Sequence, residues 1–245
     1  MKLATGCRVV GACNSQAPAG EAVSFVQQVR KESTMSVQIK WLGHATFRIS
    51  DDVVVYIDPW KLQDAPKDAD IVLVSHSHYD HYSAADVEKA GKDGCQLIAS
   101  SDVIASHGSG QAILSDRMGE VAGVTVKGVP AYNPQKQFHP RGNNWLGFVV
   151  AIGGKNIYYA GDTDVTDEMA ALEDIDVALL PVGGTYTMDA SQAADAVRHI
   201  KPKAAIPYHW GDIVGGRADA DEFAAVAGAC CDVVVLTPGQ TMTLQ

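Results

Sequence analysis

Three histidines and one aspartate lie within residues 76–81, HSHYDH, although the whole chain has only eight histidines. Imidazole nitrogens and carboxylate oxygens are the donors that zinc, iron and manganese prefer in proteins. In an extended segment His76 and His78 point to the same side, so both can bind one cation. The turn that follows would direct Asp80 and His81 toward a second cation. A functionless polar loop is the alternative, and so much histidine in one hexapeptide disfavours it.

Strands are expected to deliver these side chains and two further candidate ligands. The apolar run 71–74, directly before the histidine-rich segment, predicts a buried central strand. The runs 157–160 and 204–208 lead in the same way into Asp162 and His209. Ligand sites in α/β proteins lie at the carboxyl ends of strands. We therefore expect all these donors to meet at one edge of the fold.

Short β runs alternate with amphipathic helices from Val37 onward. No linker divides residues 36–245, so the pattern predicts one domain, a layered α/β sandwich. Helices are expected over 83–92, 101–107, 166–173, 189–200 and 219–230. Strands are expected over 37–42, 45–50, 53–58, 71–75, 96–100, 123–130, 146–152, 155–160, 177–182, 204–208 and 233–237.

Residues 1–35 differ in composition from the rest of the chain. They contain a cluster of loop-forming residues over 14–20 and no apolar segment long enough for a signal peptide. Strand-like alternation begins only after Met35. We therefore expect a flexible N-terminal extension or an upstream start codon over 1–35, and a folded domain over 36–245.

Composition excludes several classes of protein. The chain has 19 basic and 29 acidic residues, a net charge of −10, which disfavours binding to a phosphate backbone. No run of about 18 apolar residues predicts a membrane span. Five cysteines form an odd set without metal-type spacing, so we expect reduced thiols and a cytoplasmic location. A small molecule is the expected partner.

The HSHYDH segment, the later GDT at 161–163 and the strand-terminal His209 resemble, in this order, the metallo-β-lactamase superfamily. The resemblance covers roughly residues 37–240 and implies an α/β fold, a four-layer αββα sandwich with two mixed β-sheets. It also implies two metal ions and a bridging hydroxide as nucleophile. It places His76, His78 and a third residue on the first metal and Asp162 between the metals. Asp80, His81 and His209 would hold the second metal.

The segment WLGHATF at 41–47 and YIDP at 56–59 narrow this resemblance. Both are similar to the branch that contains ascorbate-6-phosphate lactonase and N-acylphosphatidylethanolamine phospholipase D. By that similarity His44 and Asp58 lie beside the metals, where a carboxylate can fix the tautomer of a ligating histidine. An ordinary half-buried histidine is the alternative for His44.

The third ligand of the first metal has two candidates in the sequence. We favour His139, because imidazole binds transition metals better than an amide does. Asn133 would either bind the metal through its oxygen or hydrogen-bond the substrate. Lys136 and Arg141 lie in the same loop, where they would receive a phosphate or carboxylate of an anionic substrate; solvated loop charges are the alternative.

Together these features predict a metal-dependent hydrolase acting on an ester, lactone or phosphodiester. The two divalent cations are expected to be zinc, with manganese, iron or nickel as alternatives. Asp80 would orient the hydroxide and shuttle its proton. The competing class is a non-hydrolytic protein, redox or metal-responsive, with the same ligands. A silent interaction protein is disfavoured, because unused buried histidines and aspartates would be costly.

Overall fold

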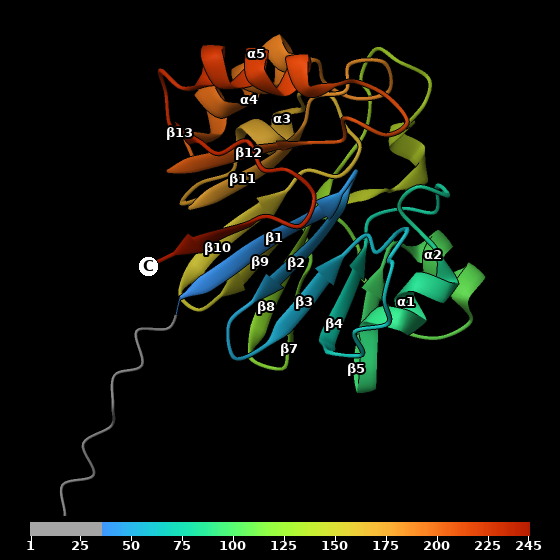
Figure 1. The fold of residues 1–245 in the computed structure, drawn as a ribbon. Coiled ribbons are helices and arrows are strands. Elements are labelled where there is room, and N and C mark those ends of the chain that lie inside the picture. The colour runs from blue at the N-terminus through green and yellow to red at the C-terminus, as the bar shows by residue number, and fades with distance from the viewer. Residues whose placement is uncertain (1–35) are drawn as a thin grey trace, which may run out of the picture. The chain divides into compact units, whose positions relative to one another are not determined.

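Two seven-stranded sheets form the centre of the computed structural model, which describes residues 36–245 (Figure 1). The predicted extension over 1–35 lies outside the described residues, so the extent of the folded domain stays a prediction. Within the described part of the chain, no helix is long and apolar enough to cross a membrane.

The first sheet has the strand order β14-β1-β2-β3-β4-β5-β6. Neighbours pair antiparallel from β14 to β3 and parallel from β3 to β6, so the sheet is mixed. Its strands are β1 (Val37–Gly43), β2 (Thr46–Ser50), β3 (Val54–Ile57), β4 (Ala69–Val74), β5 (Gly91–Ala99), β6 (Gln111–Ala112) and β14 (Thr241–Leu244).

The second sheet has the order β13-β12-β11-β10-β9-β8-β7 and is also mixed. Antiparallel pairing runs from β7 to β10 and parallel pairing from β10 to β13. Its strands are β7 (Met118–Val121), β8 (Val124–Pro130), β9 (Leu146–Ile152), β10 (Lys155–Tyr159), β11 (Val177–Pro181), β12 (Ala204–Tyr208) and β13 (Asp232–Val233).

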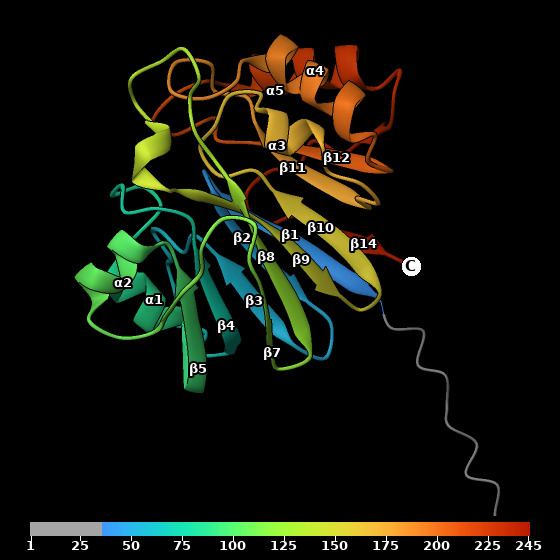
Figure 2. The same cartoon turned by 180° about the vertical axis from the view of Figure 1, so that it is seen from behind.

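Helices cover the outer faces of both sheets (Figures 1 and 2). The helices α1 (Ala84–Ala90) and α2 (Ser101–His107) lie against the first sheet, with the short 3-10 helix η1 (Arg141–Asn143) in the loop after β8. The helices α3 (Asp167–Ala170), α4 (Ala190–Ile200) and α5 (Arg217–Ala227) lie against the second. The α4 helix begins at a capping box between Asp189 and Gln192. The predicted αββα sandwich is therefore confirmed.

Strand β4 shows how the core is divided. Ile71 and Leu73 point into the core between the two sheets, whereas Val72 and Val74 point into a second core beneath α1 and α2. Alternate residues of one strand thus bury opposite faces, which confirms the predicted central strand. Its carboxyl end meets the histidine-rich segment inside the molecule, with apolar layers on both sides.

Several predicted boundaries were wrong. The helix expected over 166–173 already ends at Ala170, and the strand expected over 233–237 is the two-residue β13. Strand β5 begins at Gly91 rather than residue 96. The strands β6, β7 and β14 were not predicted at all. They are short and partly exposed, so their conformation depends on pairing with a neighbour rather than on a buried apolar face.

Candidate metal centre

The structure brings seven sequence-predicted ligands together at one edge of the two sheets. Each lies in the loop that follows the carboxyl end of a strand, which is the placement expected from the sequence. Strand β4 is followed by His76, His78, Asp80 and His81, β8 by His139, β10 by Asp162 and β12 by His209.

Two groups of donor atoms share this edge. His76, His78 and His139 offer nitrogens that all lie within 4.8 Å of one another. A second group with the same spacing contains Asp80, His81, His209 and, beside them, His44. A third group with the same spacing, Asp58, His76 and His81, joins one histidine of each set, so the two sets are adjacent. The assignment of each donor to a first or a second cation stays a prediction.

Asp162 contacts both sets. Its Oδ2 lies 3.3 Å from His139 Nε2 and 3.2 Å from His209 Nε2, and its Oδ1 lies 3.1 Å from His81 Nε2. Burial raises the pKa of this carboxyl, but His209 and His81 outweigh that effect and hold the pKa well below its ordinary value. Asp162 is therefore a carboxylate, with an oxygen available to each set.

Hydrogen bonds at Nδ1 leave the Nε2 atoms of three histidines free. Ser75 donates its hydroxyl proton to Asp58, so its oxygen accepts from Nδ1 of His76 at 2.9 Å. His81 donates from Nδ1 to Asp58 Oδ2 at 2.7 Å, and His139 donates from Nδ1 to Asn133 Oδ1 at 2.9 Å. Each partner fixes the tautomer that keeps a lone pair on Nε2.

These free atoms test whether the site fits a metal. The Nε2 atoms of His76, His81, His139 and His209 and Oδ1 of Asp162 are buried without a hydrogen-bond partner. Buried polar atoms are normally paired, because leaving them unpaired costs free energy. Burial also lowers the pKa of His76 well below its ordinary value and keeps this imidazole neutral. Burial lowers the pKa of His81 too, but Asp162 and Asp58 outweigh that effect and raise it well above its ordinary value. Imidazoles around a carboxylate are the donors that transition metals take, so the cluster fits a metal centre.

Asp58 is the centre of the network behind the ligands. Its carboxylate accepts from the backbone N–H and the hydroxyl of Ser75, from His81 Nδ1 and from the hydroxyl of Tyr159, at 2.5–2.7 Å. His44 takes a similar place beside Asp80, with Nε2 3.0 Å from Oδ2. His44 and Asp58 thus each contact a candidate ligand directly, and their place beside two metals stays a prediction. Ser75 and Tyr159 were missed, because a buried Ser or Tyr in a strand looks like ordinary core.

Asn133 holds His139 rather than facing the cluster. Its Oδ1 accepts from both the backbone N–H and Nδ1 of His139, while its Nδ2 donates to the backbone oxygen of Tyr186 at 3.0 Å. Both ends of the amide are therefore occupied. Of the two candidates for the third ligand, only His139 directs an unpartnered atom toward the other donors.

The structure does not bring Lys136 or Arg141 to the site. Lys136 pairs with Asp164 at 2.7 Å and donates to the backbone oxygen of Thr187, and Arg141 pairs with Glu168 at 2.5 Å. Neither residue lines the pocket above the cluster. The expectation that they receive an anionic substrate therefore has no support from their positions.

Three residues of this edge adopt a left-handed backbone. His44, Asp58 and His209 have φ of 46°, 46° and 62°, a region that L residues adopt at a steric cost, although Asp and His adopt it more often than most. Each of them begins the turn that carries the chain out of a strand. The backbone at these turns is therefore held in its strained conformation by the surrounding structure.

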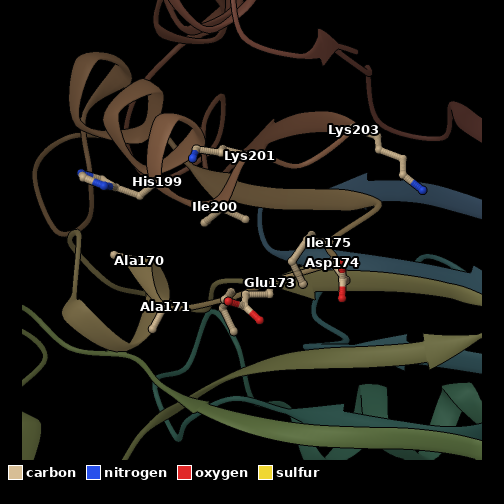
Figure 3. Close-up of a pocket in the computed structure, with 10 residues that line it drawn as sticks. Ala170, Ala171, Glu173, Asp174, Ile175, His199, Ile200, Lys201 and Lys203 are labelled. Atoms are coloured by element: carbon tan, nitrogen blue, oxygen red, sulfur yellow. The ribbon is translucent and has the colours of Figure 1, made fainter.

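A pocket of about 460 Å³ opens above the cluster and is lined in part by His78, Asp80, His139 and Asp162. A second hollow of about 520 Å³ lies at the amino ends of β11 and β12, the opposite edge of the sheet (Figure 3). Its walls include His199, Lys201 and Lys203 and contain none of the cluster residues. Of these two hollows, only the pocket above the cluster is lined by candidate ligands.

Comparison with known proteins identifies the family of this chain. The family described as "Beta-lactamase superfamily domain" matches residues 38–209. A UPF0173 metal-dependent hydrolase of Pyrococcus abyssi is 37% identical over 226 residues, which cover 85% of this chain and all of the relative. A UPF0173 metal-dependent hydrolase of Methanosarcina mazei is 30% identical over 230 residues, which cover 85% of this chain and 99% of the relative.

Solved structures show the same fold. Igni18, a metallo hydrolase from the archaeon Ignicoccus hospitalis, superposes with a TM-score of 0.72 and 26% identity. The match covers 86% of this chain and 99% of that one. The chain therefore belongs to the metallo-β-lactamase superfamily and, within it, to the UPF0173 family of metal-dependent hydrolases.

Proposed function

We propose that this protein hydrolyses an ester, lactone or phosphodiester bond of a small molecule at a site for two divalent cations. In this assignment His76, His78 and His139 would hold the first cation, Asp80, His81 and His209 would hold the second, and Asp162 would be a ligand shared by both. The observation that carries the proposal is the set of buried, unpartnered Nε2 atoms gathered around one buried carboxylate. Zinc suits such a nitrogen and oxygen donor set.

When bound, the two cations would lower the pKa of water toward neutrality, supplying a hydroxide nucleophile, and polarise the scissile bond. The residues of the chain position the reactants. Asp80 is held by His44 through Oδ2, and it also lines the pocket. Its carboxylate is therefore placed to orient the nucleophile and to accept and return a proton.

The remaining residues keep the ligands in place. Asp58, Ser75 and Asn133 each occupy the inner ring nitrogen of a histidine, so that its outer nitrogen faces the site. Partners of this kind set the orientation and basicity of a ligand. The WLGHATF segment supports a place beside the lactonase and phospholipase branch, because it supplies His44 next to Asp80.

A cytoplasmic location is part of the proposal. Cys95, Cys230 and Cys231, the cysteines of the described part of the chain, are free thiols. Free thiols persist in reducing compartments, where glutathione and thioredoxin keep them reduced.

The test begins with the metal content of the purified protein, followed by a screen against lactones, phosphodiesters, thioesters and a chromogenic β-lactam. His78→Ala should lose every activity found, and His199→Ala, an exposed histidine outside the site, should lose none. Activity that persists in His78→Ala would refute the site. Two iron atoms with a redox signal and no turnover would instead favour the non-hydrolytic alternative.

A further inference from the structure

Exposed aromatic side chains gather above the candidate metal centre. Of the five large hydrophobic residues that are exposed in residues 36–245, three line the pocket over the cluster: Tyr79, Phe138 and Tyr186, with 68%, 39% and 36% of their surface exposed. Ile213 completes the apolar wall. Clustered exposed apolar groups mark surfaces that bind apolar partners.

The aromatic residues of this wall are connected to the candidate ligands by packing and by a hydrogen bond. Phe138 precedes His139 in the chain and packs edge to face on Tyr186, with ring centroids 4.9 Å apart. The backbone oxygen of Tyr186 accepts a hydrogen bond from Asn133, the residue that also holds His139. The position of the aromatic pair is thus tied to the position of a proposed ligand.

The same pocket offers no cationic side chain. Its lining within the described residues includes neither lysine nor arginine. Apart from the candidate ligands and the two tyrosines, the polar residue of this lining is the neutral Gln137. Lys136 and Arg141, on the loop that carries His139, are turned to Asp164 and Glu168. Sites that bind phosphate or carboxylate groups commonly add Lys or Arg to pair with the anion.

We infer that the substrate is an uncharged carboxylic ester or lactone, with an apolar alkyl or aryl group that packs on Phe138 and Tyr186. The inference rests on the proposed hydrolytic function and narrows it. Water adds across the acyl C–O bond: the acyl carbon gains the hydroxyl oxygen, the leaving oxygen takes the proton, and an acid and an alcohol result. No further reactant is needed.

The test uses p-nitrophenyl esters from acetate to octanoate with the metal-loaded protein. Fully burying one methylene is worth about a fourfold change in an equilibrium, so this half-open pocket should raise kcat/KM about twofold per added methylene. Tyr186→Ala and Phe138→Ala, checked for unchanged metal content, should flatten that rise. Met118→Ala, which removes an exposed apolar side chain from β7, should not.

Binding gives a second readout that does not depend on turnover. Straight-chain hydroxamic acids of two to eight carbons carry a metal-chelating group, and their affinity, measured by calorimetry, should rise with chain length. This rise should also be lost in Tyr186→Ala. Turnover without dependence on chain length, or a preference for bis(p-nitrophenyl) phosphate, would overturn the inference and leave the hydrolytic function intact. Affinity that rises with chain length while no ester, lactone or phosphodiester is cleaved would instead refute the hydrolytic function.

Discussion

Asn133 accepts hydrogen bonds from both the backbone N–H and the ring Nδ1 of His139 through one oxygen, at 3.0 and 2.9 Å. Because a backbone N–H can only donate, that atom of Asn133 is the amide oxygen, and the ring nitrogen facing it carries the proton. The free Nε2 of His139 is thus defined by a neighbour six residues away in the chain. In the sequence, His139 and Asn133 were alternative candidates for the third ligand of the first metal. The hydrogen bonds give them different roles, because Asn133 orients the ring of His139 and His139 presents the free nitrogen.

Asn133→Ala should weaken metal binding without removing a ligand. Loss of a partner behind a ligating histidine typically costs about 10- to 100-fold in affinity, measurable by competition with a zinc chelator. His139→Ala should reduce the metal affinity further than Asn133→Ala does. It should also bind only one of the two proposed cations. Full occupancy by two cations in His139→Ala would contradict the assignment and move the ligand role to Asn133.

Tyr159→Phe should destabilise the protein by about 2 kcal/mol, because it removes a buried hydrogen bond to the Asp58 carboxylate. The neighbouring Tyr158 is a matched control, since its buried hydroxyl has no hydrogen-bond partner. Tyr158→Phe should leave the free energy of unfolding unchanged. Urea unfolding in the presence of a chelator measures both free energies, and equal losses in the two variants would refute the role given to Tyr159.

Asp176, which lies far from the site, should stabilise the folded protein to an extent that depends on pH. It accepts from the backbone N–H of Asn156 and pairs with Lys203, both at 2.7 Å. Partial burial raises its pKa, but these two partners outweigh burial and leave the pKa below its ordinary value of 3.8. A carboxyl whose pKa is lowered by folding stabilises the folded state above its unfolded pKa and loses that effect in acid.

Asp176→Asn should therefore lower the free energy of unfolding at pH 7 by at most about 1 kcal/mol, because Lys203 is exposed and water screens the pair. The difference between wild type and variant should shrink as the pH falls through 3.8 toward the lower pKa of the folded state. Urea titrations from pH 7 to pH 3 measure it. A difference that stays constant over this range would show that the charge of Asp176 has no part in stability.

The sequence predicted the parts of this protein that depend on local pattern. Candidate ligands such as Asp162 and His209 could be found because each closely follows a recognisable apolar strand. The contacts behind them could not, because Asp58 and Tyr159 are 101 residues apart and meet only when the two sheets pack. The same reason hid β14, which forms by pairing with β1 at the other end of the domain.

The left-handed backbone at His209 can be tested with two substitutions. Both His209→Gly and His209→Ala remove the imidazole, but only glycine adopts a φ of 62° without steric cost. With a chelator present, His209→Gly should be the more stable of the two by about 1 kcal/mol. Equal stability would mean that the turn relaxes when the side chain is lost.

The left-handed backbone at two of the three turns has a consequence for which residues evolution retains there. At His44 and His209 the genetically available alternatives include residues that would relieve the backbone and leave the fold more stable. Mutational drift under selection for folding alone would tend to replace both histidines. We therefore expect a library selected only for thermal stability to lose these histidines first.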